Sequence, residues 1–171
     1  MKKNELANKI SEISKLKGSF VLRSGQTSDQ YFDKYRFESR PEILKEVLIK
    51  LKDLIPKNID ALAGLELGGV PIATALSLET GIPVVFIRKR AKEYGTRQFA
   101  EGLDIKGKNL LIIEDVVTTG GQVKQSAKDL RESGAIVGNI LSVIYRGKRG
   151  GSPFLDIDLN FFHLFSQEEL P

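Results

Sequence analysis

Two adjacent carboxylates lead into a turn of small residues in the segment LLIIEDVVTTGGQ, residues 110–122. Glu114 and Asp115 end an apolar stretch, and residues 118–121 follow immediately before a possible helix. Backbone N–H groups and hydroxyls at such a helix start can surround a phosphate. The carboxylates lie too close to this turn to bind the phosphate themselves, so they can accept hydrogen bonds from sugar hydroxyls or hold a metal that bridges to a second phosphate. A phosphorylated ribose satisfies both demands.

Other interpretations of this segment remain open on its residues alone. It lacks the lysine of a Walker loop and the glycine spacing of a dinucleotide-binding turn, so neither nucleotide motif is matched. Residues 118–121 can also form an ordinary strand-to-helix turn, with Glu114 and Asp115 solvated at a strand end. The acidic pair and the turn together favour the phosphate-binding interpretation.

A basic stretch could neutralise an anionic leaving group. Five lysines and arginines fall within residues 88–97, among glycine and polar residues. Such a segment suits a flexible lid that closes over a departing diphosphate. A solvated basic loop and a nucleic-acid-binding patch are the alternatives.

The composition limits the class of protein. The 171 residues are 41% hydrophobic and 28% charged, so we expect residues 1–171 to form one domain with a substantial core. The formal net charge of +4 favours an anionic partner, which can be nucleic acid, an acidic surface or a phosphorylated small molecule. The absence of cysteine excludes a disulfide framework and a thiolate metal site. The only histidine, His163, has no acidic or hydroxyl partner at motif spacing, which argues against a Ser-His-Asp hydrolase and for a structural role.

The hydropathy pattern favours a cytoplasmic protein. Charges interrupt the apolar positions of residues 1–18, so the apolar core of a signal peptide is missing. No run approaches the roughly 20 apolar residues of a membrane span. We therefore expect a cytoplasmic protein with no membrane partner.

The periodicity of apolar residues predicts alternating helices and strands. Leu6, Ile10 and Ile13 predict a first helix that ends at Gly18. Short strands are expected in SFVLRSG and YFDKYRF, residues 19–25 and 31–37. Further helices are expected at 70–81 and 122–134, and further strands at 61–65, 83–88, 109–117, 135–146 and 160–165. This alternation predicts an α/β fold with a mostly parallel central sheet flanked by helices.

The second predicted helix follows the sequence SRPE. Ser39 and Glu42 form a capping-box pattern, and apolar residues from Ile43 to Leu51 then fall on one helical face. We therefore expect Ser39 to cap this helix.

Ligands of parallel sheets bind where loops leave the carboxyl ends of the strands. Four segments take that place in the predicted fold: 66–69, 88–95, 114–122 and 145–151. We expect the chemistry to gather there.

The segment LLIIEDVVTTGGQ resembles the phosphoribosyl-diphosphate binding motif of the type I phosphoribosyltransferases, which has an apolar strand, two acidic residues, two hydrophobic residues and a Thr/Gly loop. The resemblance implies that Glu114 and Asp115 hold the ribose hydroxyls and that residues 118–122 hold the 5′-phosphate. It extends over roughly residues 18–150 and implies the fold of that family. The terminal segments are short for the family, which implies a reduced N-terminal and C-terminal hood over the base.

The segment GSFVLRSGQTSDQYFD, residues 18–33, resembles the N-terminal signature of the orotate phosphoribosyltransferases within that family. Tyr31 and Phe32 fall where the family stacks aromatic faces on the pyrimidine ring, although alone they would be ordinary strand residues. Arg146 aligns with the arginine that binds the orotate carboxylate, although many strand-ending arginines are only solvated. The resemblance implies these orotate-binding residues: Tyr31, Phe32, Thr118, Arg146 and Arg23.

The segment FIRKRAKEYGTRQFAEG, residues 86–102, resembles the mobile catalytic loop of the same enzymes, with Tyr94 in place of the usual histidine. A phenol cannot carry the positive charge of an imidazolium at neutral pH. Residues 64–76 occupy the diphosphate-loop position, and Gly68 stands where some relatives carry a lysine. The resemblance implies these ligands of phosphoribosyl diphosphate: Arg88, Lys89, Lys92, Tyr94, Glu114, Asp115, Val116, Val117, Thr118, Thr119, Gly120, Gly121, Gln122, Gly68 and Gly69. It implies three catalytic residues: Lys89, Lys92 and Asp115.

The resemblance implies transfer of phosphoribose from phosphoribosyl diphosphate to orotate, with Mg²⁺ carried by the substrate diphosphate and no metal held by the protein alone. It also implies a homodimer whose mobile loop reaches into the neighbouring site. An adenine or xanthine phosphoribosyltransferase remains an alternative, but a purine brings no carboxylate for Arg146. The other alternative is a regulator that senses phosphoribosyl diphosphate and binds nucleic acid. We do not expect nucleic acid to be a partner.

Overall fold

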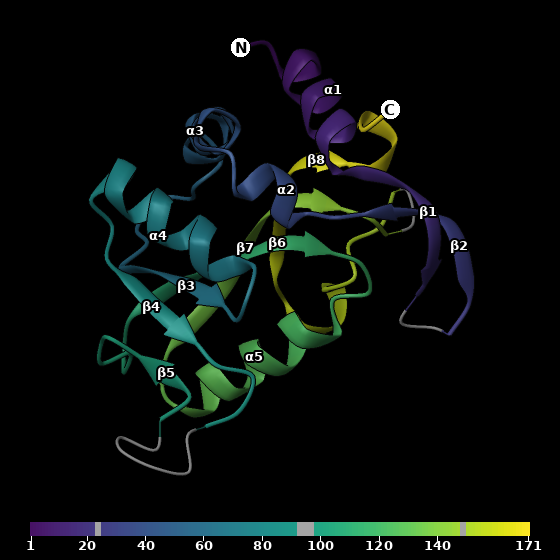
Figure 1. The fold of residues 1–171 in the computed structure, drawn as a ribbon. Coiled ribbons are helices and arrows are strands. Elements are labelled where there is room, and N and C mark those ends of the chain that lie inside the picture. The colour runs from purple at the N-terminus through teal and green to yellow at the C-terminus, as the bar shows by residue number, and fades with distance from the viewer. Residues whose placement is uncertain (23–24, 92–97, 148–149) are drawn as a thin grey trace.

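The protein is built around a six-stranded sheet with helices on both faces (Figure 1). The computed structural model describes residues 1–22, 25–91, 98–147 and 150–171. The strands are β1 (Lys15–Val21), β2 (Thr27–Phe32), β3 (Ala61–Leu65), β4 (Val84–Ile87), β5 (Ala100–Glu101), β6 (Asn109–Val117), β7 (Ile136–Tyr145) and β8 (Asn160–Ser166). The helices are α1 (Lys3–Ser14), α2 (Tyr35–Glu38), α3 (Pro41–Lys52), α4 (Gly69–Thr80) and α5 (Gly121–Glu132), with short 3-10 turns at Leu155–Ile157 and Gln167–Glu169.

The central sheet is mostly parallel, as the sequence predicts. Its order within the described residues is β5-β4-β3-β6-β7-β8, and only the short β5 runs antiparallel to its neighbour, β4. The predicted strands 61–65, 83–88, 109–117, 135–146 and 160–165 and the helices 70–81 and 122–134 are confirmed to within a residue or two. The loops after β3, β4, β6 and β7 therefore leave the same edge of the sheet.

The central strand β6 is buried on both faces. Leu110 and Ile112 pack into one apolar cluster with residues of α5, and Leu111 and Ile113 pack into the other with residues of α3 and α4. Alternate residues of a strand point to opposite faces, so helices on both sides favour an uninterrupted apolar run. Each of these four side chains is fully buried, and full burial of such a side chain contributes about 1.5–3 kcal/mol. Residues 114–117, which continue β6, therefore extend from a tightly packed segment of the strand.

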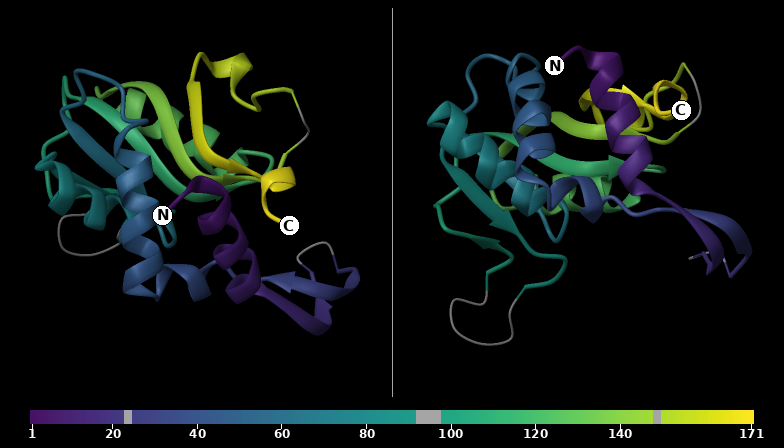
Figure 2. Two further views of the ribbon diagram at one scale, coloured as in Figure 1. Left: turned by 90° about the horizontal axis from the view of Figure 1, so that it is seen from above. Right: turned by 45° about the horizontal axis from the view of Figure 1, so that its top comes forward.

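The two ends of the chain meet beside the sheet. Lys3 in α1 pairs with Glu169 at 2.6 Å, and the ammonium of Lys15 donates to the carbonyl of Leu170 at 3.5 Å. Strands β1 and β2 form a separate antiparallel hairpin, which projects from the body of the molecule in Figure 2. These terminal segments form the small hood that the sequence implies.

The predicted end of the first helix is wrong. α1 ends at Ser14, and Gly18 lies inside β1. The reason is tertiary: from Lys15 onward the chain pairs with β2, beginning opposite Phe32. The strand expected at 19–25 is therefore β1, which starts earlier and ends at Val21.

The predicted capping box at Ser39 and Glu42 is also wrong. Arg40 is the N-cap of α3 and Pro41 takes the first helical position, while the Ser39 hydroxyl donates to the carbonyl of Arg36 at 3.3 Å. Proline suits the first helical position because its fixed φ matches the helix and its missing N–H has no partner to lose there. Pro41 therefore sets the helix start one residue later than the pattern suggests.

The strand predicted for residues 31–37 is wrong beyond its second residue. β2 ends at Phe32 and α2 begins at Tyr35. The Asp33 carboxylate accepts the backbone N–H of Tyr35 at 3.2 Å, and the Asp33 carbonyl accepts that of Arg36 at 3.2 Å. Aspartate readily bonds to backbone N–H groups just ahead of it and so starts a helical turn.

Among the described residues, none of the helices has both the length and the apolar character that crossing a membrane requires.

Candidate active site

The largest hollow near the acidic pair lies at the carboxyl edge of the sheet. It has a volume of about 1010 Å³. Its lining comes from α2, the loop after β4, the end of β6 and the start of α5: Lys34, Arg88, Lys89, Glu114, Val116, Val117, Thr118, Thr119, Gly120, Gly121 and Gln122, with four more residues of α5. The structure thus brings most of the expected phosphoribosyl-diphosphate ligands to one cavity, here called the main cavity.

Of the acidic pair, Glu114 lines the main cavity, and Asp115 pairs with Lys34, another residue of the lining. Asp115 is completely buried and Glu114 is 8% exposed. The backbone N–H of Val116 donates to Oδ1 of Asp115 at 2.6 Å, and the ammonium of Lys34 lies 2.5 Å from Oδ2. Oδ1 thus accepts a hydrogen bond and Oδ2 lies in an ion pair, and both interactions stabilise the ionised carboxylate.

The two carboxyl groups differ in protonation. Burial, followed by the hydrogen bond to Asp115, raises the pKa of Glu114 to about 9. Burial would raise the pKa of Asp115 too, but its interactions with Glu114 and Lys34 outweigh burial and lower it below the ordinary value. Two neighbouring carboxylates repel each other when both are ionised, which raises the pKa of one of them. Near neutral pH the pair therefore holds one proton, on Glu114, and one negative charge, on Asp115.

Two residues of the site were missed by the sequence interpretation: Lys34 and Glu38. Lys34 comes from the segment expected to be a strand and Glu38 directly follows that segment, and both interact with Asp115 once α2 forms. Glu38 is 8% exposed, and burial, followed by the charge of Asp115, raises its pKa to about 8. The signal that could have found them is Asp33, which as a helix starter places residues 34 and 38, four apart, on one face.

The turn at the start of α5 has the shape of an anion site. Gly120 is the N-cap of α5 with φ of +76°, a left-handed conformation that favours glycine. A Cβ there would also lie 2.4 Å from the ring of Phe154. Thr118 and Thr119 precede it and line the main cavity. The free N–H groups and the positive end of the helix dipole can therefore meet a phosphate at this turn.

The loop after β3 is pressed against the acidic pair. A Cβ on Gly68 would lie 1.7 Å from Oδ2 of Asp115, and a Cβ on Gly69 would lie 2.2 Å from the carbonyl oxygen of Ile113. Glycine is therefore required at both positions for the loop to lie this close to β6. Gly68 and Gly69 sit beside the acidic pair, as a diphosphate loop would.

Glu66, in the same loop, was also missed and joins three parts of the site. Its carboxylate accepts the backbone N–H of Lys89 at 2.9 Å, and its carbonyl accepts the side-chain amide of Gln122 at 2.9 Å. These bonds link the loop after β3 to the basic stretch and to the first turn of α5. No sequence motif marks Glu66, because its partners lie 23 and 56 residues away.

The residues expected at the base gather beside the main cavity. Tyr31, Phe32 and Arg146 line a pocket of about 340 Å³, and the guanidinium carbon of Arg146 lies 5.6 Å from the centre of the Phe32 ring. Arg146 and Thr118 also line a neighbouring hollow of about 770 Å³. Arg146 is fixed by its backbone N–H, which donates to the carbonyl of Val117 at 2.8 Å. Arg23 lies outside the described residues.

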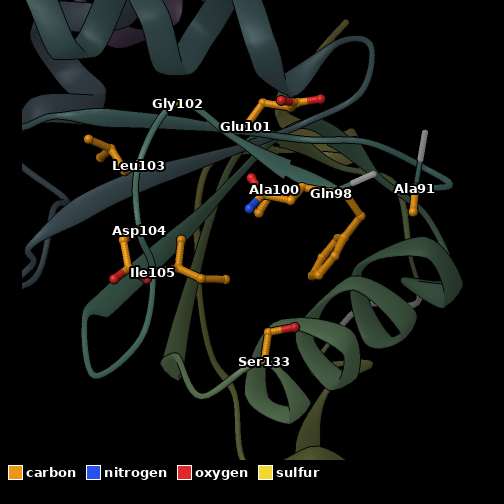
Figure 3. A pocket seen from close by; sticks show the side chains of 10 residues that line it. Ala91, Gln98, Ala100, Glu101, Gly102, Leu103, Asp104, Ile105 and Ser133 are labelled. Carbon is orange, nitrogen blue, oxygen red and sulfur yellow. The ribbon is translucent and has the colours of Figure 1, made fainter. Parts of the chain in front are cut away.

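The basic stretch is placed only in part. Arg88 and Lys89 line the main cavity, whereas Lys92 and Tyr94 lie outside the described residues. Figure 3 shows a separate hollow of about 610 Å³ beside β5, between Ile105 and Ser133. Its lining includes neither the acidic pair nor the turn of α5, so the main cavity remains the candidate site.

His163 lies away from the acidic pair, in an aromatic group on β7 and β8. Its ring centre lies 5.4 Å from that of Tyr145 and 5.1 Å from that of Phe161. Burial lowers the pKa of His163, so the ring is neutral at pH 7. This packing supports the expected structural role.

The described residues contain no group of three or more His, Cys, Asp or Glu suited to hold a metal ion. Asp115 is paired with Lys34, whereas Arg88 and Lys89 line the cavity. This donor set fits a divalent cation that arrives on an anionic ligand better than one held by the protein alone.

Comparisons with known proteins agree on one family. The profile of the phosphoribosyl transferase domain matches residues 36–160. The chain is 46% identical over 165 residues to an orotate phosphoribosyltransferase of Nocardioides, covering 96% of this chain and 92% of the relative. It is 47% identical over 148 residues to one of Pyrococcus horikoshii, covering 84% and 80%. A crystal structure of the orotate phosphoribosyltransferase of Aeropyrum pernix is 28% identical with a TM-score of 0.81 and covers 99% of this chain and 96% of that one.

Proposed function

This chain belongs to the phosphoribosyltransferase family, among the orotate phosphoribosyltransferases, and on that premise we propose that it transfers phosphoribose from phosphoribosyl diphosphate to orotate. The products are orotidine 5′-monophosphate and diphosphate, so the enzyme is a glycosyltransferase of pyrimidine nucleotide synthesis. The observation that carries the proposal is the main cavity, which Glu114 and the helix-start turn line together with Lys34, the partner of the buried Asp115. The names of the relatives support orotate as the acceptor.

The 5′-phosphate would bind the turn from Thr118 to Gln122, and the ribose hydroxyls would donate to the acidic pair. Bond breaking at an anomeric carbon passes through an oxocarbenium-like state, in which positive charge grows on the sugar. The ionised carboxylate of Asp115 would stabilise that charge electrostatically. Glu114, which holds a proton, can donate to or accept from a hydroxyl.

The departing diphosphate needs positive charge on the other side of the sugar. Arg88 and Lys89 face the cavity, and the glycines at 68 and 69 let backbone groups approach the leaving group. Bound to the diphosphate, Mg²⁺ would supply further positive charge against which the leaving group departs. Lys92 and Tyr94 belong to the same proposed lid.

Orotate would enter the pocket beside the main cavity. A guanidinium pairs with a carboxylate through two parallel hydrogen bonds, which suits Arg146 to the orotate carboxylate. Phe32 and Tyr31 offer flat faces for the pyrimidine ring, and Thr118 can reach the base from the phosphate turn. Arg23 belongs to the same proposed set.

We further propose that residues 1–171 form one domain and that the enzyme is a cytoplasmic homodimer with sites shared across the interface. If Lys92 acts in the neighbouring site, mixed Lys92→Ala and Asp115→Asn subunits recover activity that neither variant has alone. Light scattering gives the mass of the assembly. A monomer, or mixtures that stay inactive, would contradict shared sites.

The test of the proposed function follows the loss of orotate absorbance in the presence of phosphoribosyl diphosphate and Mg²⁺. We expect turnover with orotate and none with adenine or xanthine. Turnover with a purine and not with orotate would replace the proposed acceptor, because it would leave Arg146 without a carboxylate to bind.

A further inference from the structure

Lys34 reaches the acidic pair from a helix that is remote from it in sequence. Its ammonium lies 2.5 Å from Oδ2 of Asp115 and 5.3 Å from the centre of the Tyr35 ring. The Lys34 side chain is 31% exposed and lines the main cavity, whereas the Asp115 side chain is completely buried. Lys34 therefore contacts both the buried Asp115 carboxylate and the main cavity.

The carboxylate of Asp115 is confined on three sides. The N–H of Val116 donates to Oδ1 at 2.6 Å, a Cβ on Gly68 would collide with Oδ2, and the ammonium of Lys34 lies 2.5 Å from Oδ2. A buried carboxylate held by only one of these contacts could rotate or take up a proton. Lys34 is the one charged group among the three, so it contributes both orientation and charge balance.

We propose that Lys34 is a positioning residue for the reaction: its ammonium fixes the Asp115 carboxylate against the Gly68 loop in the orientation that receives the ribose. The proposal rests on the proposed function and deepens it. Lys34 acts through Asp115, and the ligand's phosphates are held by other residues. Lys34, at the N-cap of α2, thus supplies a cation to Asp115 on β6.

The charged surroundings support this role. The groups that face Asp115 and Lys34 are Glu114 on β6, with Asp33, Tyr35 and Glu38 at or near α2. Burial would lower the pKa of Lys34, but interaction with Asp115 outweighs it and raises the pKa. Lys34 therefore stays charged across the working pH range, while the pKa of Glu38 and that of Glu114 are raised to about 8 and about 9, so that both are neutral near pH 7. Lys34 and Asp115 then form an ion pair beside two neutral carboxyl groups.

The experiment is a double-mutant cycle on binding of phosphoribosyl diphosphate with Mg²⁺, measured by calorimetry without any acceptor. The variants are Lys34→Met, Asp115→Asn and the double variant, with Lys34→Arg as the conservative replacement. Lys45→Met is the matched control, because Lys45 is an exposed lysine of α3 outside the main cavity. Thermal unfolding identifies folded variants, and Lys34→Gln replaces Lys34→Met if the latter does not fold.

We expect Lys34→Met to weaken binding about tenfold and Lys34→Arg to recover most of that loss. In the Asp115→Asn background the same change should weaken binding less than twofold, because its target is already neutral. A tenfold loss that persists in that background would mean that Lys34 contacts the ligand directly, and it would overturn the proposal. Unchanged binding in Lys34→Met would overturn it as well.

The pH dependence gives a second readout that a merely structural role would not change. Without Lys34, Asp115 keeps its proton to higher pH, so the loss of binding on acidification should begin about one pH unit higher in Lys34→Met than in the wild type. Lys34→Arg and Lys45→Met should follow the wild-type curve, and identical curves for Lys34→Met and the wild type would contradict the proposal.

Failure of the proposed acceptor can be distinguished from failure of the proposal for Lys34. If the wild type binds phosphoribosyl diphosphate but leaves orotate unchanged, the double-mutant cycle on binding can still be measured. A wild type that binds no phosphoribosyl diphosphate overturns both proposals.

Discussion

Two segments bring charge to the main cavity, and they do so by different means. The segment from Glu114 to Gln122 is one continuous strand, turn and helix start, so its function is encoded in neighbouring residues. The segment from Tyr31 to Glu38 contributes Lys34 and Glu38 only because the chain turns at Asp33 and folds α2 over the end of β6. The comparison teaches that the part of this site proposed to bind the ligand is local in sequence, whereas the part that controls its charge depends on tertiary structure.

The largest effect should come from the local segment, at Asp115. Asp115→Asn keeps the shape of the side chain and removes the charge proposed to stabilise the reacting sugar, so we expect kcat/KM to fall by about 100-fold to 1000-fold. Steady-state turnover of orotate measures it. Asp53→Asn, at the exposed end of α3, is the control and should keep wild-type activity. A loss below tenfold at Asp115 would remove the catalytic role of the acidic pair.

A second change tests the contact between the loop after β3 and the acidic pair. In Gly68→Ala the new methyl group would collide with Oδ2 of Asp115, so either the carboxylate or the loop must move. We expect the KM for phosphoribosyl diphosphate to rise and kcat/KM to fall by about 10-fold to 100-fold, because small misplacements at a reacting centre are costly.

Gly138→Ala is the matched control for that change, because a Cβ at Gly138 meets nothing within 4 Å. Both variants should be checked for folding by circular dichroism. Wild-type kinetics for Gly68→Ala would show that the loop can retreat without cost, and the tight packing would then have no role in catalysis.

A third change distinguishes binding of orotate from binding of phosphoribosyl diphosphate. Arg146→Gln removes the proposed partner of the orotate carboxylate and should raise the KM for orotate about tenfold, while the KM for phosphoribosyl diphosphate stays within twofold. Initial rates at varied concentrations of each substrate measure both constants. Arg40→Gln at the exposed start of α3 is the control. Equal changes in both constants would argue that Arg146 supports the fold instead of the base.

The smallest effect on activity should come from the tertiary segment, at Glu38. Its pKa is raised to about 8 in the folded protein, so folding favours its protonated form and this stabilisation is lost as the pH rises from about 5 to above 8. Glu38→Gln resembles the protonated acid and should keep activity at pH 7 within threefold. Between pH 6 and pH 9 the wild type should lose more stability than Glu38→Gln, by on the order of 1–2 kcal/mol after allowance for partial solvation.

Urea unfolding at the two pH values measures this difference. The exposed Glu42→Gln variant, at the start of α3, should lose stability with pH as the wild type does. If Glu38→Gln and the wild type lose the same stability, Glu38 is ionised at neutral pH and the charge balance around Asp115 is different from the one described.

The same contrast explains how much could be predicted from the sequence. Strands β3, β4, β6, β7 and β8 are marked by apolar runs that both faces of a parallel sheet require, and the acidic pair and turn stand next to each other in the chain. The predicted strand over residues 31–37 failed because aromatic and apolar residues there satisfy a strand pattern, while one local bond at Asp33 starts a helix. Glu66 escaped notice because its partners come from distant loops.

The central claim is that the turn of α5 holds the sugar phosphate while the acidic pair holds the ribose hydroxyls. A crystal structure with phosphoribosyl diphosphate and Mg²⁺ tests it most directly. It should place the 5′-phosphate on the backbone N–H groups of residues 118–122 and the two hydroxyls within hydrogen-bond distance of Glu114 and Asp115. A phosphoribosyl group bound elsewhere, with the turn and the acidic pair left free, would contradict the account.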